Sequence, residues 1–427
     1  MSRQTPVAEK AQQDTADPSG PRRDPRLLSV AASPRGWWHA IKRNIRSGEL
    51  GAAPVVIGLL LIAIVFQTLN DRFLSPQNLS NLTVQIAAIG LMTTGVIMVL
   101  LLGEIDLSIG SVAGLAAGVL AVTVMRHGWP EWAGITMALG VGLFVGLFHG
   151  YVFARIGVPA FVVTLAGLLG WQGLHLWVMS PDGTINTRSD GIIAALTQTY
   201  FVTWIGWCVV ALVLVFYLVS VLTVERKRSL SGLPHKPLPE ILLRAGLLMV
   251  PLVVGVWVLN QYKGLPLAFL VFVGAVVILD LVLRKTRYGR MVYAVGGNAE
   301  AARRAGINIV AIRISVFGIA STLAALGGVM LVSRNIAAST TTGGGSELMM
   351  AIAAAVIGGT SLFGGRGNAY SALLGGLVLG AITSGLLLLP GIDTSVRFMI
   401  TAAVLLVAVI IDAMSRRGRK THARGGA

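Results

Sequence analysis

The chain has 427 residues and a net charge of +16; 55% of its residues are hydrophobic, 12% are charged, and the mean hydropathy is +0.77. Soluble domains carry about 25% charged residues, and several apolar runs here reach the ~20 residues that a membrane-spanning helix needs. The composition therefore excludes a soluble domain and predicts an all-α, polytopic transmembrane helical bundle. Because Lys and Arg gather in loops and tails, their charge indicates membrane orientation rather than nucleic-acid binding. A single cysteine, Cys208, excludes an intrachain disulfide.

The first 48 residues are predicted to form a cytoplasmic tail. Residues 1–35 are rich in Pro, Asp, Gln, Ser and Arg without apolar periodicity, which is typical of disorder. Gly36–Gly48 combines Trp37 and Trp38 with several cations, and it is either a short interfacial helix or the flank of the first span. Because the first apolar run begins near Leu50, this polar tail is too long for the start of a signal peptide.

Twelve apolar segments follow, and each is predicted to be a membrane span. They are Ala52–Leu69, Leu82–Leu102, Leu107–Met125, Trp132–Ala154, Ala160–Met179, Phe201–Leu222, Ile241–Leu259, Leu265–Leu283, Val310–Val332, Leu348–Leu362, Tyr370–Leu389 and Val396–Ile411. Leu348–Leu362 is short and Gly-terminated, so it is either a full span or a partial, re-entrant one. Small residues in the later spans, as in Leu323–Gly328 and around Gly375 and Gly380, predict close helix packing.

The distribution of cations agrees with twelve crossings and with both termini in the cytoplasm. With the N-terminus inside, Glu225–Glu240, Arg284–Ile309 and the tail after Asp412 become cytoplasmic, and these segments hold the main clusters of Lys and Arg. The outer segments carry few cations, as the positive-inside rule requires. We therefore expect a transmembrane domain over residues 49–413, including the cytoplasmic loop 284–309, and a basic cytoplasmic tail over residues 414–427.

Two carboxylates, Glu104 and Asp106, interrupt the apolar run Val99–Ala113. A carboxylate at mid-membrane costs roughly 2.5–3.5 kcal/mol, and residues two apart on a helix point to nearly opposite sides. With Gly103 before them and Ser108 after, the pattern predicts a helix that ends near Gly103, a turn, and a second helix capped by Asp106 or Ser108. The break lies either beside a translocation path or at the membrane surface, where Asp106 is only an N-cap.

The stretch Gly103–Ser111 has a weak counterpart at Gly358–Gly365, since each follows an apolar helix and precedes one rich in Gly and Ala. Transporter folds are often built from two related halves with broken helices in matching places; the alternative is chance similarity between two Gly-rich turns. The two stretches supply our candidate residues of a translocation path: Glu104, Asp106, Ser108, Ser111, Thr360 and Ser361. The six His residues are scattered without metal-ligand spacing, so we expect His149 and His175 to be packed or interfacial.

Arg284–Ile309 is the longest patterned polar segment between spans, and it predicts a short helix. Asn298 suits an N-cap, Glu300 suits the positive end of the helix, and Ala299–Ala305 is rich in strong helix formers. Gly306 is a natural residue to follow the helix C-terminus.

A helix of about two turns is well below the ~12–15 residues needed for marginal stability in water, so it must pack on something. Its small face, formed by Ala301, Ala302 and Ala305, suits insertion into a groove on a partner. The alternative is that the helix rests on the chain's own membrane domain.

Three motifs, in order along the chain, carry a family resemblance. They are GEIDLSIGS at 103–111, YGRMVYAVGGNAEAARRAGIN at 288–308 and SELMMAIAAAVIGGTSLFGGRGN at 346–368. Together they closely resemble the permease subunits of bacterial ABC sugar importers of the ribose/xylose/arabinose branch, and the similarity runs from about Ala52 to Asp412. Ribose-type permeases usually have Gly where Glu104 stands, and Phe201–Asn260 resembles an additional helix pair of xylose-type permeases. The resemblance is therefore greatest to the xylose type.

This resemblance implies a division of labour in the bacterial inner membrane. Two permease chains form the pathway as a homodimer, and its cargo is a monosaccharide, here a pentose such as D-xylose. Two cytoplasmic ATPase subunits bind the coupling loops of the permease chains. A periplasmic or lipid-anchored protein delivers the sugar. The chain itself is expected to be non-catalytic, without cofactor or metal and without nucleic-acid binding, and it has no G-x-x-x-x-G-K-[ST] phosphate loop. The coupling residues that the resemblance implies are Gly296, Gly297, Asn298, Glu300, Ala301, Ala302 and Gly306.

The alternative is an ion-coupled secondary sugar transporter that works without an ATPase, in which Glu104 and Asp106 bind protons or sodium. The helix at Asn298–Gly306 discriminates between the two, because a secondary transporter has no reason to dock a partner there. A membrane enzyme is disfavoured, since no nucleophile, metal cluster or acid–base constellation stands out in the sequence.

Overall fold

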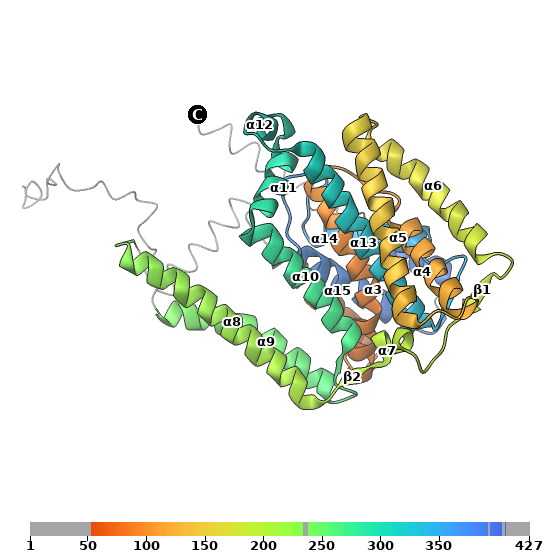
Figure 1. Ribbon diagram of the computed structural model, residues 1–427. Helices are drawn as coiled ribbons and strands as arrows, with labels where there is room; N and C mark the ends of the chain where they lie inside the picture. The colour runs from red at the N-terminus through yellow and green to blue at the C-terminus, as the bar shows by residue number, and fades with distance from the viewer. Residues whose placement is uncertain (1–52, 234–237, 392, 404–405, 407–427) are drawn as a thin grey trace, which may run out of the picture. The chain divides into compact units, whose positions relative to one another are not determined.

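The computed structural model describes residues 53–233, 238–391, 393–403 and 406, and these are mostly helical (Figure 1). The helices are α2 (Ala53–Leu69), α3 (Pro76–Leu101), α4 (Ile109–Met125), α5 (Glu131–Tyr151) with the π-helical turn η2 (Val152–Ile156), α6 (Ala160–Met179), α7 (Ile192–Gln198), α8 (Thr203–Leu230), α9 (Leu238–Asn260), α10 (Leu267–Lys285), α11 (Arg287–Gly297), α12 (Ala299–Arg304), α13 (Ile309–Asn335), α14 (Gly345–Ile357) and α15 (Tyr370–Leu388). Two short antiparallel pairs join β1 (Thr184–Asn186) to β4 (Ala337–Ser339) and β2 (Tyr200–Phe201) to β3 (Leu265–Pro266).

Eight helices of the described residues are long and apolar enough to cross a membrane, and α2, α4 and α14 are shorter apolar helices. The prediction of an all-α, multi-pass membrane protein is therefore confirmed. The 13 residues of α14 span about 20 Å at ~1.5 Å per residue, well short of a hydrocarbon core of ~30 Å. That length supports the partial-span interpretation of Leu348–Leu362. The twelve crossings and the cytoplasmic termini remain predictions.

Several helix boundaries lie close to the predicted spans, but α3 begins earlier, α8 continues past the predicted Leu222 to Leu230, and α14 ends at Ile357, before the predicted Leu362. Ala160–Met179 is reproduced as α6. In contrast, α3 begins at Pro76, six residues before the predicted Leu82, because Ser75 caps it: the Ser75 hydroxyl accepts a hydrogen bond from Asn78 N–H at 3.3 Å. Proline at the first helical position also favours this start. The apolar pattern of the sequence predicts the hydrophobic part of α3 but not its polar first turns.

Several predictions fall wholly or partly outside the described residues. The tail over 1–48, its segment Gly36–Gly48 and the tail over 414–427 lie outside them, as does part of the last predicted span, Val396–Ile411. Within that span, residues up to 403 are described and helical.

The described chain forms two compact units. The larger, here called the core unit, holds the described residues of Gly48–Val213 and Met249–Ala427. The smaller holds Leu214–Leu248, parts of α8 and α9, on which Phe216 and Leu247 are among the exposed large apolar side chains. Such exposure suits a surface that faces lipid.

Helix α13 lies at the centre of the core unit, packed against α3, α4 and α5. Small residues bring the backbones together: a Cβ at Gly142 would lie 2.7 Å from Ser321 O, and one at Gly327 would lie 2.9 Å from Ala88 O. Gly375 of α15 likewise packs on the α14 backbone at Ala354. These contacts confirm the predicted close packing of the later spans, the usual solution for helices in lipid.

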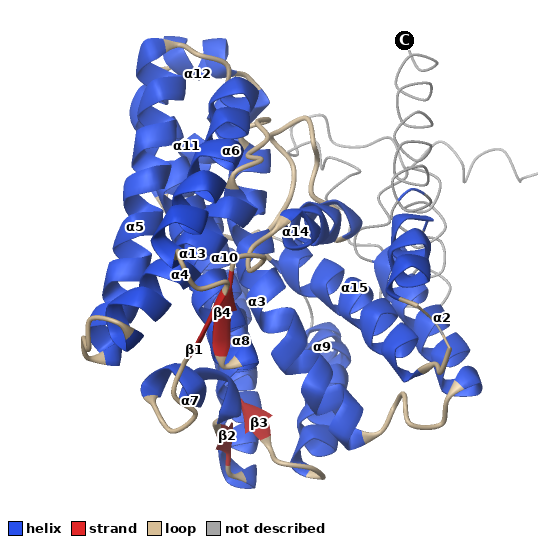
Figure 2. Cartoon of the chain, turned by 90° about the vertical axis from the view of Figure 1, so that its right-hand side faces the viewer, coloured by secondary structure: helices blue, strands red, loops and turns tan. Residues whose placement is uncertain are grey.

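The core unit has two distinct ends. Figure 2, like Figure 1, places α11 and α12 at one end and α7 with β2 at the other, with α3 and α13 running between them. The first end carries the loop that the sequence analysis assigned to the cytoplasm. The second end carries the β2–β3 pair, whereas β1 and β4 lie nearer the middle in Figure 2; each pair joins segments that are far apart in the sequence.

Candidate functional site

The break between α3 and α4 is a non-helical stretch from Leu102 to Ser108. Gly103 has φ of 80°, a left-handed conformation that glycine adopts without steric cost, so the predicted helix end near Gly103 is confirmed. Ser108 occupies the N-cap position of α4, but its hydroxyl caps no helix N–H. Asp106 Oδ1 accepts hydrogen bonds from the Ser108 N–H (2.8 Å) and Oγ–H (2.6 Å) instead. The predicted side-chain cap of α4 is therefore wrong, because Asp106 folds onto the residue two positions ahead as in an Asx turn.

Asp106 is the end of a buried hydrogen-bond chain that joins the break to α5 and α6. The Ser108 hydroxyl lies 3.2 Å from His149 Nδ1, and Trp171 Nε1–H donates to His149 Nε2 at 2.8 Å. An indole nitrogen only donates, so Nε2 is an acceptor and Nδ1 of the neutral ring carries the hydrogen. The donors then run in one direction, from Trp171 through His149 and Ser108 to the Asp106 carboxylate. His149 is 1% exposed and packed within this chain, as the sequence analysis expected.

The chain of donors fixes three elements around the break. A further contact comes from α6, where Thr164 Oγ1 donates to Ile105 O at 3.3 Å. Ser111 Oγ donates to the Ser108 carbonyl at 2.9 Å, and the same carbonyl accepts the first helical bond of α4 from Val112 N–H at 2.9 Å. In lipid an unpaired backbone group costs several kcal/mol, so these side chains make a broken helix tolerable.

Glu104 points to a different partner from Asp106. Its Oε1 lies 3.8 Å from Arg313 NH2 on α13, and the two side chains are 26% and 28% exposed. The Arg313 guanidinium also lies 4.4 Å from the ring centroid of Phe153, within the range of a cation–π contact. The two carboxylates therefore diverge, as their spacing predicts.

Most of the candidate path residues are buried in the interior of the core unit. Asp106, Ser108, Ser111, Thr360 and Ser361 are each at most 4% exposed. Their burial favours a role in holding the break over one in lining an open surface of this chain.

The second Gly-rich stretch packs directly on the first. Gly365 N–H donates to Leu101 O at 2.9 Å, although all the elements from α4 to α14 separate this stretch from α3 in the sequence. A Cβ at Gly364 would lie 2.9 Å from the Gly103 Cα. The two stretches, which the sequence analysis paired by their pattern, are therefore in backbone contact.

The C-terminal end of α11 completes this contact, which we call the glycine junction (Gly103, Gly296, Gly297, Gly364 and Gly365). A Cβ at Gly296 would overlap Leu101 O and lie 3.0 Å from Gly365 N, and one at Gly364 would lie 2.7 Å from Gly296 O. Only residues without a Cβ permit this approach, so three remote segments of the chain meet through their backbones.

Helix α11 is anchored to the core unit along its buried face. Its Val292 and Val295 side chains are buried, and Tyr293 Oη–H donates to Gly367 O at 2.8 Å. Burial raises the pKa of Tyr293 above its usual range, since the charged phenolate is poorly solvated there. The hydroxyl therefore stays protonated and keeps this bond at neutral pH.

Helix α12 forms as the sequence predicts. Asn298 Oδ1 accepts from Ala301 N–H at 2.9 Å, and Gly306 has φ of 80° after the last turn. Bonds from Gly306 N to Arg303 O (3.0 Å) and from Ile307 N to Ala302 O (3.1 Å) close the C-terminus as a Schellman motif.

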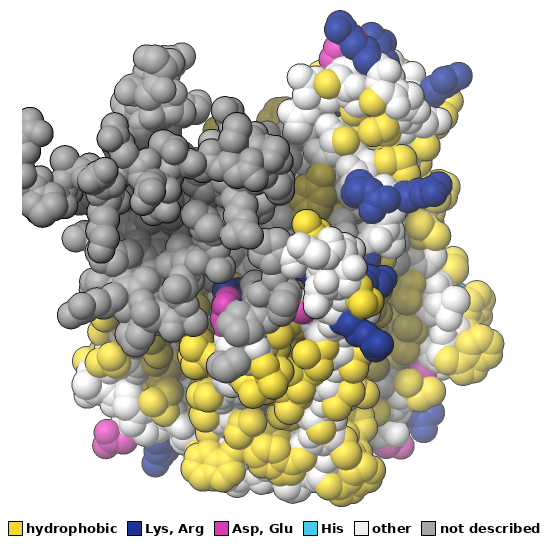
Figure 3. Space-filling view, turned by 90° about the vertical axis from the view of Figure 1, so that its left-hand side faces the viewer, with side chains coloured by type: hydrophobic (Ala, Val, Ile, Leu, Met, Phe, Trp, Pro, Cys, Tyr) yellow, Lys and Arg dark blue, Asp and Glu magenta, His cyan; other side chains and the backbone are white. Residues whose placement is uncertain are grey.

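The charged side chains of α12 lie on its solvent-exposed surface. Arg303 and Arg304 both bond to Glu300, which holds the pKa of Glu300 below its usual range. Figure 3 shows Lys and Arg side chains gathered toward the end of the core unit that carries α12. This end is therefore strongly basic at its surface.

The small face of α12 divides into two parts. Ala301 and Ala305 are exposed, whereas Ala302 is 4% exposed and packs in the core of this chain. The alternative in which the helix rests on the chain's own helices holds for Ala302, and insertion into a partner's groove stays a prediction for Ala301 and Ala305. One side of α12 rests on the chain's own helices, and the side with Ala301 and Ala305 is free to meet a partner.

Comparison with known proteins adds the family. The model of the family described as "Branched-chain amino acid transport system / permease component" matches residues 78–409. The chain belongs to this permease family. The permease is 32% identical to the xylose transport system permease protein XylH of Escherichia coli (strain K12) over 375 residues, 88% of this chain and 94% of the relative.

Two further relatives are similar over nearly their whole length. XylH of Haemophilus influenzae is 32% identical to the permease over 376 residues (88% of this chain, 99% of the relative). The ribose import permease protein RbsC of Bacillus subtilis is 30% identical over 356 residues (83% and 91%). No solved structure matches the permease. Among the described residues there is no group of three or more His, Cys, Asp or Glu side chains that would hold a metal ion.

The sequence analysis missed three features of this site: Trp171, Arg313 and the whole of α11. Trp171 and Arg313 are polar groups on apolar spans, and their partners lie far away in the sequence. A signal for α11 exists, because Gly289, Val292 and Val295 recur at helical spacing, and these three are the buried positions of the helix.

Proposed function

We propose that this permease is the membrane-spanning subunit of an ATP-binding-cassette importer that carries a monosaccharide, D-xylose or another pentose, into a bacterial cell. Its relatives are named for xylose and ribose transport, which supports a sugar as the cargo. A homodimer of this chain forms the pathway in the inner membrane, a separate cytoplasmic ATPase hydrolyses ATP, and a periplasmic or lipid-anchored protein delivers the sugar.

The observation that carries this proposal is the placement of α12 beside the glycine junction. Ala301 and Ala305 offer an exposed, small surface to an ATPase groove, and Gly296 lies five residues before Ala301, in backbone contact with the α3–α4 break. A displacement of α12 by the ATPase therefore reaches both Gly-rich stretches through α11. The coupling residues Gly296, Gly297, Asn298, Glu300, Ala301, Ala302 and Gly306 serve either to present this surface or to maintain the junction.

The α3–α4 break acts in this proposal as a positioned joint. Asp106, Ser108 and Ser111 hold its shape through hydrogen bonds inside the core unit. In the second stretch Ser361 Oγ accepts a hydrogen bond from Phe363 N–H at 3.2 Å, and Thr360 is buried. Glu104 ties the joint to α13 through Arg313. Buried, hydrogen-bonded groups of this kind have few alternative arrangements, so the joint moves as a unit.

The second candidate function, an ion-coupled secondary transporter, is disfavoured by the partner of Glu104. An ion site needs a carboxylate that is open to the ion, whereas Glu104 faces the Arg313 guanidinium at 3.8 Å, a cation that competes for this carboxylate.

Uptake into proteoliposomes tests the proposal. The permease is reconstituted with and without its ATPase and a sugar-binding protein, and labelled D-xylose is supplied outside. Concentrative uptake that requires ATP and all three components is expected. Uptake by the permease alone, driven by a proton or sodium gradient and indifferent to ATP, would overturn the proposal in favour of the secondary transporter.

A further inference from the structure

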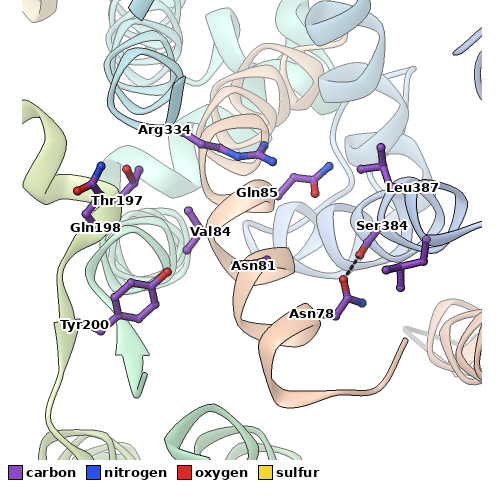
Figure 4. A pocket seen from close by; sticks show the side chains of 11 residues that line it. Asn78, Asn81, Val84, Gln85, Thr197, Gln198, Tyr200, Arg334, Ser384 and Leu387 are labelled. Atoms are coloured by element: carbon purple, nitrogen blue, oxygen red, sulfur yellow. Dashed lines mark hydrogen bonds between the residues drawn. The ribbon is translucent and has the colours of Figure 1, made fainter. Parts of the chain in front are cut away.

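A polar cavity of about 360 Å³ lies at the end of the core unit opposite to α12. It is formed by α3, the segment from α7 to β2, and the C-terminal parts of α13 and α15 (Figure 4). Pockets that bind small molecules measure about 300–1,000 Å³, so this cavity is large enough for a small ligand.

An amide stripe on α3 forms one wall of the cavity. Asn78, Asn81 and Gln85 are spaced i, i+3 and i+7, which places them on one face of the helix, and all three line the cavity. Gln85 is nine residues into α3, roughly 13 Å from the helix start at 1.5 Å per residue. Because the apolar part of α3 begins at Leu82, Gln85 lies about one turn inside it, where a polar side chain usually faces a polar interior or a pathway.

The three amides do not have the same role. Asn78 is structural: its Oδ1 accepts from Ser384 Oγ at 2.8 Å, and its Nδ2 donates to Phe73 O at 2.7 Å. The side chains of Asn81 and Gln85 have no hydrogen-bond partner among the described residues. Gln85 is half-buried, so the bonding capacity of its unpartnered amide is left for a ligand or water, whereas Asn81 is exposed.

The opposite wall supplies a cation and an aromatic ring. Figure 4 shows the Arg334 guanidinium and the Gln85 amide approaching one another from α13 and α3, with Tyr200 on the α7–β2 side. Arg334 makes no ion pair with any described residue, and the cavity is lined by no Asp or Glu. A lining without carboxylates does not suit a cationic ligand. A single guanidinium balances only part of the negative charge of a phosphorylated ligand. Amide, guanidinium and phenol groups together suit a neutral ligand with several hydroxyl groups.

We propose that this cavity is a sugar subsite of the permease, in which Asn81, Gln85 and Arg334 bind hydroxyl groups of the monosaccharide before it passes through the pathway. The inference rests on the proposed function, since it assigns a place to the cargo of that importer. The open, half-exposed lining suits transport, because a transit site must bind well enough to admit the cargo and weakly enough to release it.

The test replaces one amide of the stripe and a matched amide outside it. Gln85→Met removes the hydrogen-bonding group and keeps side-chain length and helix propensity. Gln77→Met, on the exposed first turn of α3 and outside the cavity lining, is the control. Each variant is reconstituted in proteoliposomes as the full complex with ATPase and sugar-binding protein, and uptake of D-xylose and of its single-deoxy analogues is measured.

Loss of one hydrogen bond to a sugar hydroxyl should slow D-xylose uptake about two- to tenfold in Gln85→Met and leave Gln77→Met near wild type. Gln85→Met should also lose the discrimination between D-xylose and the one deoxy analogue that lacks the bonded hydroxyl. Asn81→Leu gives an independent second variant with the same expectation for another hydroxyl.

Two results would overturn the inference while leaving the proposed function intact. One is equal uptake by Gln85→Met, Asn81→Leu and Gln77→Met in a complex whose wild type imports D-xylose. The other is slower uptake that is fully explained by weaker association of the sugar-binding protein, measured by its co-purification, with sugar discrimination unchanged; the cavity would then be a docking surface. A wild-type complex that imports no sugar at all refutes the proposed function itself.

Discussion

The two carboxylates of the α3–α4 break differ in what they hold. Asp106 accepts two hydrogen bonds inside the core unit and terminates the chain of donors that begins at Trp171. Glu104 makes a single ion pair of 3.8 Å with Arg313, and both partners are partly exposed. Loss of a buried hydrogen-bond acceptor costs more free energy of folding than loss of a partly exposed ion pair. Replacement of each carboxylate by Ala therefore distinguishes the two.

We expect Asp106→Ala to impair the permease much more than Glu104→Ala. Removal of the Asp106 carboxylate leaves the buried Ser108 N–H and hydroxyl without an acceptor, at a cost of about 1–3 kcal/mol for each buried group left unpaired. Loss of the Glu104–Arg313 pair should cost about 1 kcal/mol or less. Thermal unfolding in detergent, abundance in membranes and sugar uptake measure the difference. Asp106→Asn, which keeps an acceptor oxygen, should be milder than Asp106→Ala; wild-type stability and uptake of Asp106→Ala would contradict this account of the break.

At the scale of single residues, the sequence predicts which polar residues in apolar spans have a structural role, but it does not predict their contacts. The break near Gly103 and the packed state of His149 and His175 follow from residue type and spacing, and both His side chains are at most 1% exposed. The partners do not follow: Ser108 meets His149 from 41 positions away in the chain, and Glu104 meets a residue on α13. No periodic pattern encodes such a distant contact, because it depends on how complete helices pack.

At the scale of elements, α12 is a short helix with two different faces. Its start at Asn298 and end near Gly306 follow from capping rules that act within a few residues, so the sequence was sufficient to place it. Helix α11 was missed because its glycines and cations obscure a buried stripe of Gly289, Val292 and Val295. The polar start of α3 was missed for a related reason, since a search for apolar runs passes over the Ser75 cap.

The two faces of α12 predict opposite outcomes for one substitution at neighbouring positions. Ala301→Trp adds volume on the exposed face, so the permease should fold normally. It should lose association with the ATPase, because overpacking a groove typically costs roughly 1–3 kcal/mol, about five- to a hundredfold in affinity. Ala302→Trp adds the same volume in the buried core and should reduce the folded permease itself. Membrane abundance and co-purification of the ATPase separate the two effects.

Arg303→Ala is the mild control for this pair, since it removes only an exposed ion pair with Glu300, worth about 1 kcal/mol or less. Normal ATPase co-purification and ATP-dependent uptake with Ala301→Trp would remove the main physical support for an ATPase partner at α12.

At the scale of the whole molecule, orientation in the membrane remains a prediction from charge. Twelve crossings with cytoplasmic termini place Lys236 and Ser415 inside and Asp182 and Gly344 outside. A reporter active only in the cytoplasm should therefore give signal when fused after Lys236 or Ser415 and none after Asp182 or Gly344. Signal at Gly344 would break the crossing count and would reverse the assignment of the ends of the core unit.

The glycine junction is the feature of the whole fold that the sequence could least reveal. Gly-rich stretches at residues 103, 296–297 and 364–365 are each visible in the sequence as turns, and the pattern alone indicates the similarity between the first and the third. That they touch is a consequence of packing α3, α11 and the α14–α15 connection around one point. Their contact gives the loop that carries α12 a direct backbone route to the break, and it makes the role of each glycine testable.

Gly296 and Gly297 are adjacent glycines with different surroundings, and they form a matched pair for this test. A Cβ at Gly296 would overlap Leu101 O and crowd Gly365 N, whereas a Cβ at Gly297 meets nothing within 4 Å. Gly296→Ala should therefore push α11 away from both Gly-rich stretches at a cost of roughly 1–3 kcal/mol, while Gly297→Ala leaves the contact in place.

Because the exposed face of α12 is unchanged in both variants, each should still co-purify with the ATPase. Gly296→Ala should nevertheless lose the coupling between ATP hydrolysis and uptake: ATPase activity should no longer respond to the loaded sugar-binding protein, and concentrative uptake should fall at least tenfold relative to Gly297→Ala. Membrane abundance of the two variants, measured in parallel, separates uncoupling from misfolding. Equal uptake by the two variants at equal abundance would show that force does not pass through the junction, and would leave α12 as a docking element whose movement reaches the pathway by another route.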